Sequence, residues 1–100
     1  MVPLLTKPVA SKRLLDMDFK RWCRDGDTIE SVLNVAVENL QTIEGSSDIT
    51  LGSHSFSGIR AQVWIPAGGT AGERYRVTVT CRMTPSGEEL PGDGIVVLRG

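Results

Sequence analysis

The most regular hydrophobic and polar pattern in the chain runs over residues 74–84. Apolar and polar side chains alternate there at every second position, and the apolar members are Tyr75, Val77, Val79, Cys81 and Met83. A strand presents successive side chains to opposite faces, so this pattern predicts a strand with one buried face. Tyr75 opens the stretch after a glycine-rich connection, which is typical of a tyrosine corner whose hydroxyl bonds a nearby backbone group.

Shorter stretches of the same alternation predict further strands, separated by turns rich in Gly, Pro, Ser and Asp. The expected strands cover residues 13–22, 28–37, 48–56, 59–65 and 95–98. Within residues 28–37 the pattern is ambiguous, because Val32, Val35 and Leu40 also fit a helical stripe. Dense β-branched residues favour a strand there, and a helical turn at residues 38–41 remains open.

Six to seven short strands with little or no helix predict an all-β protein, an immunoglobulin-like antiparallel β-sandwich. Another small Greek-key sandwich or a barrel is the alternative fold. Residues 1–11 develop no apolar period, and Pro3 and Pro8 oppose a helix or a central strand. We therefore expect an extended N-terminal arm at residues 1–11 and a sandwich domain at residues 12–100.

Length and charge exclude several classes of protein. The chain has 100 residues, which suffices for one hydrophobic core. Eleven Lys and Arg stand against twelve Asp and Glu, giving a net charge of −1, so we expect neither nucleic-acid nor membrane-surface binding. No apolar run reaches the roughly 20 residues of a membrane span, and the apolar start is too short for a secretory signal.

No arrangement of side chains predicts catalysis or a cofactor. His54, the single histidine, lies in a serine-rich stretch without the orienting carboxylate of a triad. Residues 68–72 are glycine-rich but lack the lysine and the following helix of a phosphate loop. Asp25, Asp27 and Glu30 offer fewer ligands than calcium requires, so a capped turn is favoured over a metal site.

Two cysteines, Cys23 and Cys81, allow a single disulfide. In a reducing cytosol two free thiols are favoured, and the bridge is the alternative. Cys81 lies on the inward face of its strand, where a buried thiol behaves as a small apolar side chain.

Exposed aromatic and basic side chains mark the expected partner contacts. Trp64 shares an outward face with Arg60 and Gln62, and Arg74 and Arg76 lie on the outward face of the next strand. Trp and Arg are enriched at the energetic centres of interfaces. If the two strands are neighbours, Trp64 lies among guanidinium groups; a solvated face is the alternative. With the apolar arm, the candidate contacts are Val2, Leu4, Leu5, Arg60, Trp64, Arg74 and Arg76.

Two stretches of the chain resemble a known family. The first consists of LDMDF at residues 15–19, Trp22 and GDTI at residues 26–29. The second consists of AQVWI at residues 61–65, GGTAG at residues 68–72 and YRVT at residues 75–78. Together they are similar to the small structural proteins of tailed bacteriophages called fiber-tail adaptor proteins.

The resemblance implies a single immunoglobulin-like domain that connects the neck or tail of a phage to a fibre. It implies no catalytic residues, and partners among neck, tail or portal-associated proteins and fibre proteins. It also implies several copies in a ring, in a virion assembled in the cytoplasm of the host bacterium. The alternative function is a carbohydrate- or surface-binding adhesion module, for which Trp64 is the one good aromatic platform.

Overall fold

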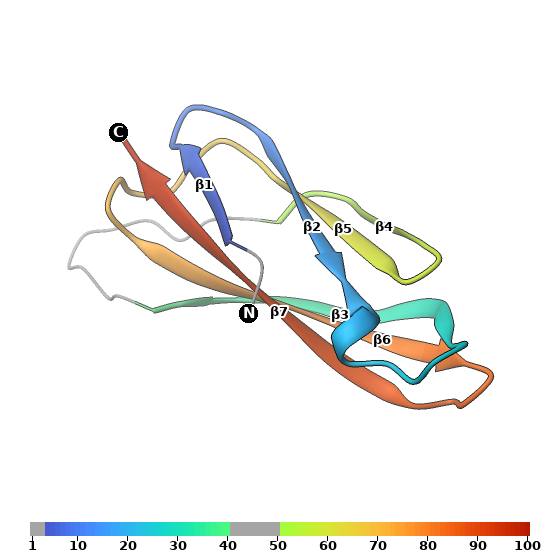
Figure 1. The fold of residues 1–100 in the computed structure, drawn as a ribbon. Helices are drawn as coiled ribbons and strands as arrows, with labels where there is room; N and C mark the ends of the chain where they lie inside the picture. The colour runs from blue at the N-terminus through green and yellow to red at the C-terminus, as the bar shows by residue number, and fades with distance from the viewer. Residues whose placement is uncertain (1–3, 41–50) are drawn as a thin grey trace.

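The chain folds into two β-sheets that face each other (Figure 1). The computed structural model describes residues 4–40 and 51–100. A four-stranded sheet has the order β1-β7-β6-β3, and a three-stranded sheet has the order β2-β5-β4. The elements are β1 (Leu4–Pro8), β2 (Arg13–Asp18), the short 3-10 helix η1 (Phe19–Arg21), β3 (Thr28–Asn39), β4 (His54–Ser57), β5 (Arg60–Ile65), β6 (Arg74–Thr84) and β7 (Glu89–Arg99).

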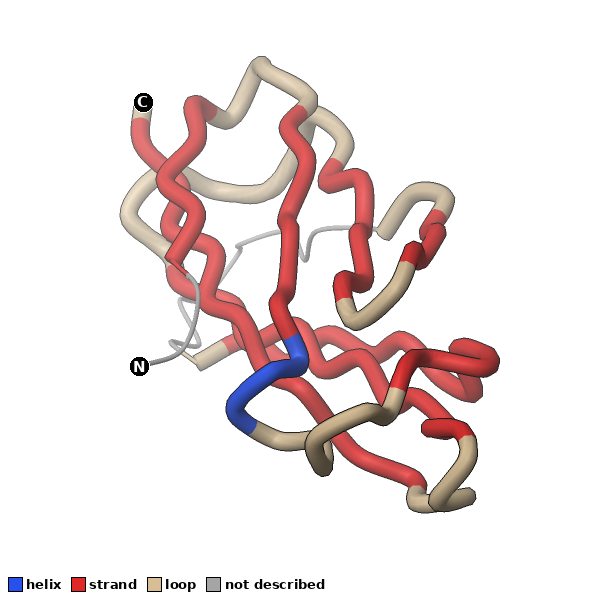
Figure 2. The backbone as a smooth tube through the Cα atoms, turned by 45° about the vertical axis from the view of Figure 1, so that its right-hand side comes forward, coloured by secondary structure: helices blue, strands red, loops and turns tan. Residues whose placement is uncertain are grey.

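Strands dominate the described chain, as Figure 2 shows, and the one helical turn lies at the end of β2. Asp18 caps this turn, because its side chain accepts a hydrogen bond of 2.9 Å from the backbone nitrogen of Lys20. The all-β sandwich predicted from the alternation is confirmed. The narrower assignment to an immunoglobulin-like topology stays a prediction.

β3 is a strand throughout, which resolves the ambiguous pattern. Two register shifts between β3 and β6 mark β-bulges. They turn Ile29, Val32, Val35 and Val37 all toward the core, opposite inward residues of β6. The bulges therefore explain why the spacing resembled a helical stripe. The strand continues to Asn39, so residues 38 and 39 are extended and do not form the alternative helical turn. Residue 41, the last position of that turn, lies outside the described residues.

β7 is longer than the sequence predicted, since it begins at Glu89 and contains Pro91. Leu98 donates its N–H to the Glu73 carbonyl at 3.0 Å, on the side of β6. Alternate residues of a strand turn their N–H groups to the same side, so the nitrogen of Pro91 faces the opposite edge. A proline there removes no hydrogen bond to β6, which is why the strand tolerates it.

Two other predicted strands are shorter in the structure. The first ends at Asp18, where η1 begins, rather than extending to residue 22. Of the strand predicted over residues 48–56, only the end is seen, as β4; residues 48–50 lie outside the described residues. The turn predicted after Trp22 is present, with Gly26 at a φ of 87°, a conformation that favours glycine.

The expected N-terminal arm contributes an edge strand. Its residues Leu4–Pro8 form β1, which pairs in parallel with Ile95–Arg99 of β7 (Figure 1). This pair departs from the purely antiparallel sandwich that the sequence predicted, because β1 and β7 run in the same direction. Leu5 and Lys7 turn toward the core, whereas Leu4 and Thr6 turn outward.

The core consists of the inward side chains of both sheets, namely Leu15, Met17, Phe19, Ile29, Ala61, Val63, Ile65, Tyr75, Val77, Val79, Cys81, Met83, Val96 and Leu98. Two glycines of β7 bring the layers close together. A Cβ atom on Gly92 would lie 2.7 Å from Phe19 Cζ and 2.8 Å from Trp22 Cζ3, and one on Gly94 would lie 3.0 Å from Met17 Cε. Because glycine has no side chain, Phe19, Trp22 and Met17 can occupy the space beside the backbone of β7.

Two chemical groups of the core have defined states, the hydroxyl of Tyr75 and the cysteine thiols. Tyr75 donates its hydroxyl hydrogen bond to the buried carboxylate of Glu73, a side-chain partner two residues earlier in the chain. Cys23 and Cys81 are free thiols, as a reducing cytosol predicted. Burial raises the pKa of the Cys81 thiol to about 11, so this cysteine is an inert part of the core at neutral pH.

Gly92→Ala should destabilise the protein. The new methyl group meets two aromatic rings below contact distance, and overpacking a core costs about 1–3 kcal/mol. The loss of unfolded-state entropy returns only about 0.4–1 kcal/mol. Urea unfolding monitored by tryptophan fluorescence measures the difference. Gly100→Ala is the control, because its Cβ would make an ordinary 3.9 Å contact; equal stability of the two variants would contradict the close approach.

Candidate partner-binding surfaces

The outer face of the four-stranded sheet gathers apolar and basic side chains where β1, β7 and β6 lie side by side. The register places Leu4 beside Ile95 and Ile95 beside Arg76. In the next row, Val97 lies beside Arg74. We name this surface the arginine face; it consists of Leu4, Ile95, Val97, Arg74, Arg76 and Arg99.

The arginine face is apolar at its edge and positively charged. Leu4 is 66% exposed, more than any other large apolar side chain of the described residues. Arg76 forms an ion pair of 3.5 Å with Glu38, and both side chains are largely in solvent, so the pair contributes little. Neither Arg74 nor Arg99 has a carboxylate partner within residues 4–40 and 51–100.

The outer face of the three-stranded sheet carries the exposed tryptophan. Trp64 of β5 lies opposite Leu14 of β2 and is 38% exposed. The Lys12 ammonium lies 4.9 Å from the centroid of its ring, which is a cation–π contact. Farther along the same face, Arg60 bonds the Asp16 carboxylate at 2.8 Å. We name this surface the tryptophan face; it consists of Lys12, Leu14, Asp16, Asp18, Arg60, Gln62 and Trp64.

The structure divides the predicted contacts between these two faces. The sequence left open whether the strand of Trp64 lies beside that of Arg74 and Arg76. It does not, because the chain crosses from one sheet to the other between β5 and β6. The cation on the indole ring is therefore Lys12 and not an arginine. The two groups share no surface.

The N-terminal candidates have three different placements. Leu4 joins the arginine face, whereas Leu5 packs against the core and is only partly exposed. Val2 lies outside the described residues. Lys7, a basic residue for which a solvated or partner-facing position was expected, is instead fully buried, and its ammonium donates to the carbonyl oxygens of Pro8 at 2.9 Å and Ser11 at 2.8 Å. These bonds tie β1 to the turn that leads into β2.

The sequence also missed apolar members of both faces. Ile95 and Val97 were read only as part of a strand, although period-2 alternation opposite the buried Val96 and Leu98 places them outward. Leu14 was missed for the same reason. In each case the signal was the alternation itself, which assigns half of the apolar residues of a strand to the outer face.

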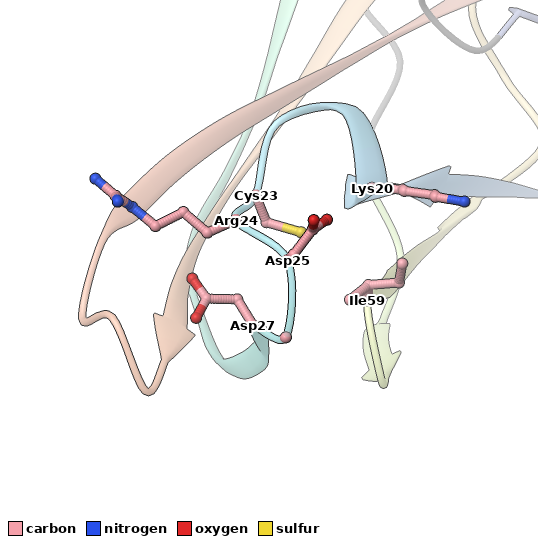
Figure 3. A pocket seen from close by; sticks show the side chains of 7 residues that line it. Lys20, Cys23, Arg24, Asp25, Asp27 and Ile59 are labelled. Atoms are coloured by element: carbon pink, nitrogen blue, oxygen red, sulfur yellow. The ribbon is translucent and has the colours of Figure 1, made fainter.

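A small pocket of about 260 Å³ lies beside the turn after η1 (Figure 3). The carboxylate of Asp27 turns away from Asp25 and accepts hydrogen bonds from the hydroxyl and the backbone nitrogen of Ser86. Arg24 forms a 2.6 Å ion pair with Glu88. These contacts fasten the turn to the β6–β7 connection, so Asp27 caps that connection. Within the described ranges no group of acidic, His or Cys residues could hold a metal ion.

The remaining chemical candidates also have structural placements. His54 lies on β4, and Ser55, the next residue, points to the opposite side of that strand. His54 borders a groove of about 370 Å³ between β3 and residues 51–54, whose described lining contains apolar side chains and no carboxylate. The glycine-rich residues 68–72 connect β5 to β6, and a strand rather than a helix follows them.

Comparison with known proteins identifies the chain. A family model described as "Podophage GP4 fiber-tail adaptor protein gp77" matches residues 7–90. The chain belongs to this family. The adaptor matches no curated protein sequence and no solved structure. The family supports a structural role in a phage tail for the adaptor, and the resemblance noted in the sequence is confirmed.

The part of the adaptor that the structure describes contains no helix with the length and apolarity of a membrane span. The two outer sheet faces of the adaptor differ in charge and composition. The arginine face has an excess of cations, whereas Lys12 and Arg60 of the tryptophan face are balanced by Asp16 and Asp18.

Lys7→Met should change how the stability of the adaptor depends on pH. Desolvation by burial lowers the pKa of Lys7 below its ordinary value. Between the lowered pKa and the unfolded value of about 10.4, the unfolded chain binds a proton that the folded chain does not. The contribution of Lys7 to the free energy of unfolding therefore rises with pH in that window, and Lys7→Met should make the pH slope less positive than in the unsubstituted protein by removing this contribution.

The measurement is urea unfolding between about pH 8 and about pH 10, below the ordinary lysine pKa. Lys20→Met, a substitution at an exposed lysine of η1, is the control and should keep the slope of the unsubstituted protein. Identical slopes for Lys7→Met and the unsubstituted protein would show that Lys7 is not desolvated.

Proposed function

We propose that the adaptor is a non-enzymatic virion protein that holds a tail or neck protein on one outer sheet face and a fibre protein on the other. Family membership supports the connecting role. The observation that carries the two-sided arrangement is the division of the exposed aromatic, apolar and arginine side chains between the two sheets.

The geometry of a sandwich suits this task. The outer faces of two stacked sheets point in opposite directions, and the sheets are separated by about 10 Å of packed side chains. Two partners can therefore bind at once without competing for surface. The buried core between the faces keeps their relative position constant, which a connector between two rigid assemblies requires.

We further propose that several copies of the adaptor form a ring around the neck or tail, close to portal-associated proteins. Repeating one contact around a ring raises the overall strength of attachment through effective concentration, without a stronger single site. The virion would be the final location, after assembly in the cytoplasm of the host bacterium.

Glycan binding is the weaker alternative. A sugar stacks on a free aromatic ring, and one side of the Trp64 ring already carries the Lys12 ammonium. No second aromatic side chain is seen on the described part of the tryptophan face. The surface therefore fits a protein partner better, since Trp and Arg concentrate binding energy at such interfaces.

Trp64→Ala should weaken binding to one of the two partners by about tenfold, because it removes a partly exposed aromatic anchor. The fold should persist, since the side chain points away from the core. The assay measures binding of purified adaptor to adaptor-free tails and, separately, to isolated fibres of the same phage.

Gln62→Ala is the matched control, two residues away on the same face. It should bind both partners like the unsubstituted adaptor. Undiminished binding of Trp64→Ala to both partners would remove the tryptophan face from the proposal. Specific binding on a glycan array that Trp64→Ala abolishes would support the adhesion module instead.

A further inference from the structure

We propose that the arginine face binds an acidic protein surface, in which carboxylates are flanked by apolar side chains. This inference rests on the proposed function and names the chemistry of one of its two partners. It follows from three observations: the cations of the face are without a carboxylate partner in the described ranges or only weakly paired, exposed apolar side chains lie beside them, and most carboxylates elsewhere on the described chain already have partners.

The cations of the face are poorly compensated. Arg74 and Arg99 lack a carboxylate partner in the described ranges, and the contact of Arg76 with Glu38 is 3.5 Å long and open to solvent. By contrast, Arg60 of the tryptophan face bonds Asp16 at 2.8 Å and lies 3.9 Å from Asp18. The charge excess is therefore local, because the chain as a whole carries a net charge of −1.

The apolar side chains determine which acidic partner fits. Leu4 is 66% exposed, and Ile95 and Val97 are half-buried beside the two guanidinium groups of β6. A guanidinium forms bidentate hydrogen bonds with a carboxylate, and the bonds strengthen when a neighbouring apolar contact excludes water. Nucleic acid would satisfy the arginines but would leave Leu4 in contact with a charged backbone, so a protein fits better.

A second copy of the adaptor is a poorer occupant, because most described carboxylates already have partners. Asp16 and Asp18 face Arg60, Glu88 faces Arg24, and Glu89 faces Arg82. Asp93 accepts a hydrogen bond from Thr78 and Asp27 one from Ser86. Among the described acidic side chains only Asp25 and Glu30 have no such partner, so a different protein is the better source of carboxylates for three arginines.

The test compares the double variant Arg74→Glu/Arg76→Glu with the unsubstituted adaptor, in binding to adaptor-free tails and to isolated fibres. The expected result is at least about tenfold weaker binding to one partner and unchanged binding to the other. Raising the NaCl concentration to about 0.5 M should weaken binding of the unsubstituted adaptor to the same partner, because salt screens exposed charges. Arg74→Lys/Arg76→Lys keeps the charge and should retain most of the binding.

Arg82→Glu is the matched control. Arg82 lies on the same strand and outer face, is similarly exposed, and pairs with Glu89 at the far end of β7. It should bind both partners normally, and thermal melts should show that every variant is folded. Cross-linking should then identify partner carboxylates whose change to arginine restores binding of Arg74→Glu/Arg76→Glu.

Four results would overturn the inference. If the double variant Arg74→Glu/Arg76→Glu is folded and binds both partners normally, the arginine face is not a binding surface, although the proposed connecting role of the adaptor is unaffected. If the unsubstituted adaptor self-associates and the double substitution abolishes this, the face binds a second copy of the adaptor. If the face binds an oligonucleotide and neither protein, its partner is nucleic acid. If the unsubstituted adaptor binds neither tails nor fibres, the proposed function fails and the inference fails with it.

Discussion

Leu15 and Met17 of β2 and Phe19 of η1 lie against the backbone of β7 at Gly92 and Gly94, and this contact between the two layers governs the rest of the structure. A side chain at either glycine would push the sheets apart. Because the sheets interlock there, the inward positions of β6 and β7 are buried and their alternate positions are forced outward. The exposed surfaces of the adaptor are thus a direct consequence of how the core closes.

This arrangement produces two outer faces with different chemistry. One joins apolar side chains to arginines whose charge is not balanced, and the other carries a tryptophan within a set of balanced charges. Charge complementarity mainly governs the rate and specificity of association, whereas an aromatic anchor mainly supplies binding energy. A protein that joins two assemblies benefits from this difference, because neither partner can take the place of the other.

The edge strand β1 links the N-terminus to both the core and the surface. Its inward residues Leu5 and Lys7 help to close the end of the sandwich, and its outward Leu4 extends the arginine face. The Lys7 ammonium bonds backbone carbonyls of the following turn, so the burial of its charge is compensated by hydrogen bonds. The same segment therefore contributes to stability and to the proposed contact.

The sequence by itself determined the strands with strict alternation, the all-β class and the family, because the period of two and the motifs at residues 61–78 are local features. The same period predicted which side chains of β5 and β6 point into the core and which point outward. Only the tertiary structure decided that these two strands belong to different sheets, that bulges give β3 its irregular spacing, and that the N-terminal segment is an edge strand. These features depend on pairing between residues far apart in the chain, and local periodicity carries no information about which strands become neighbours.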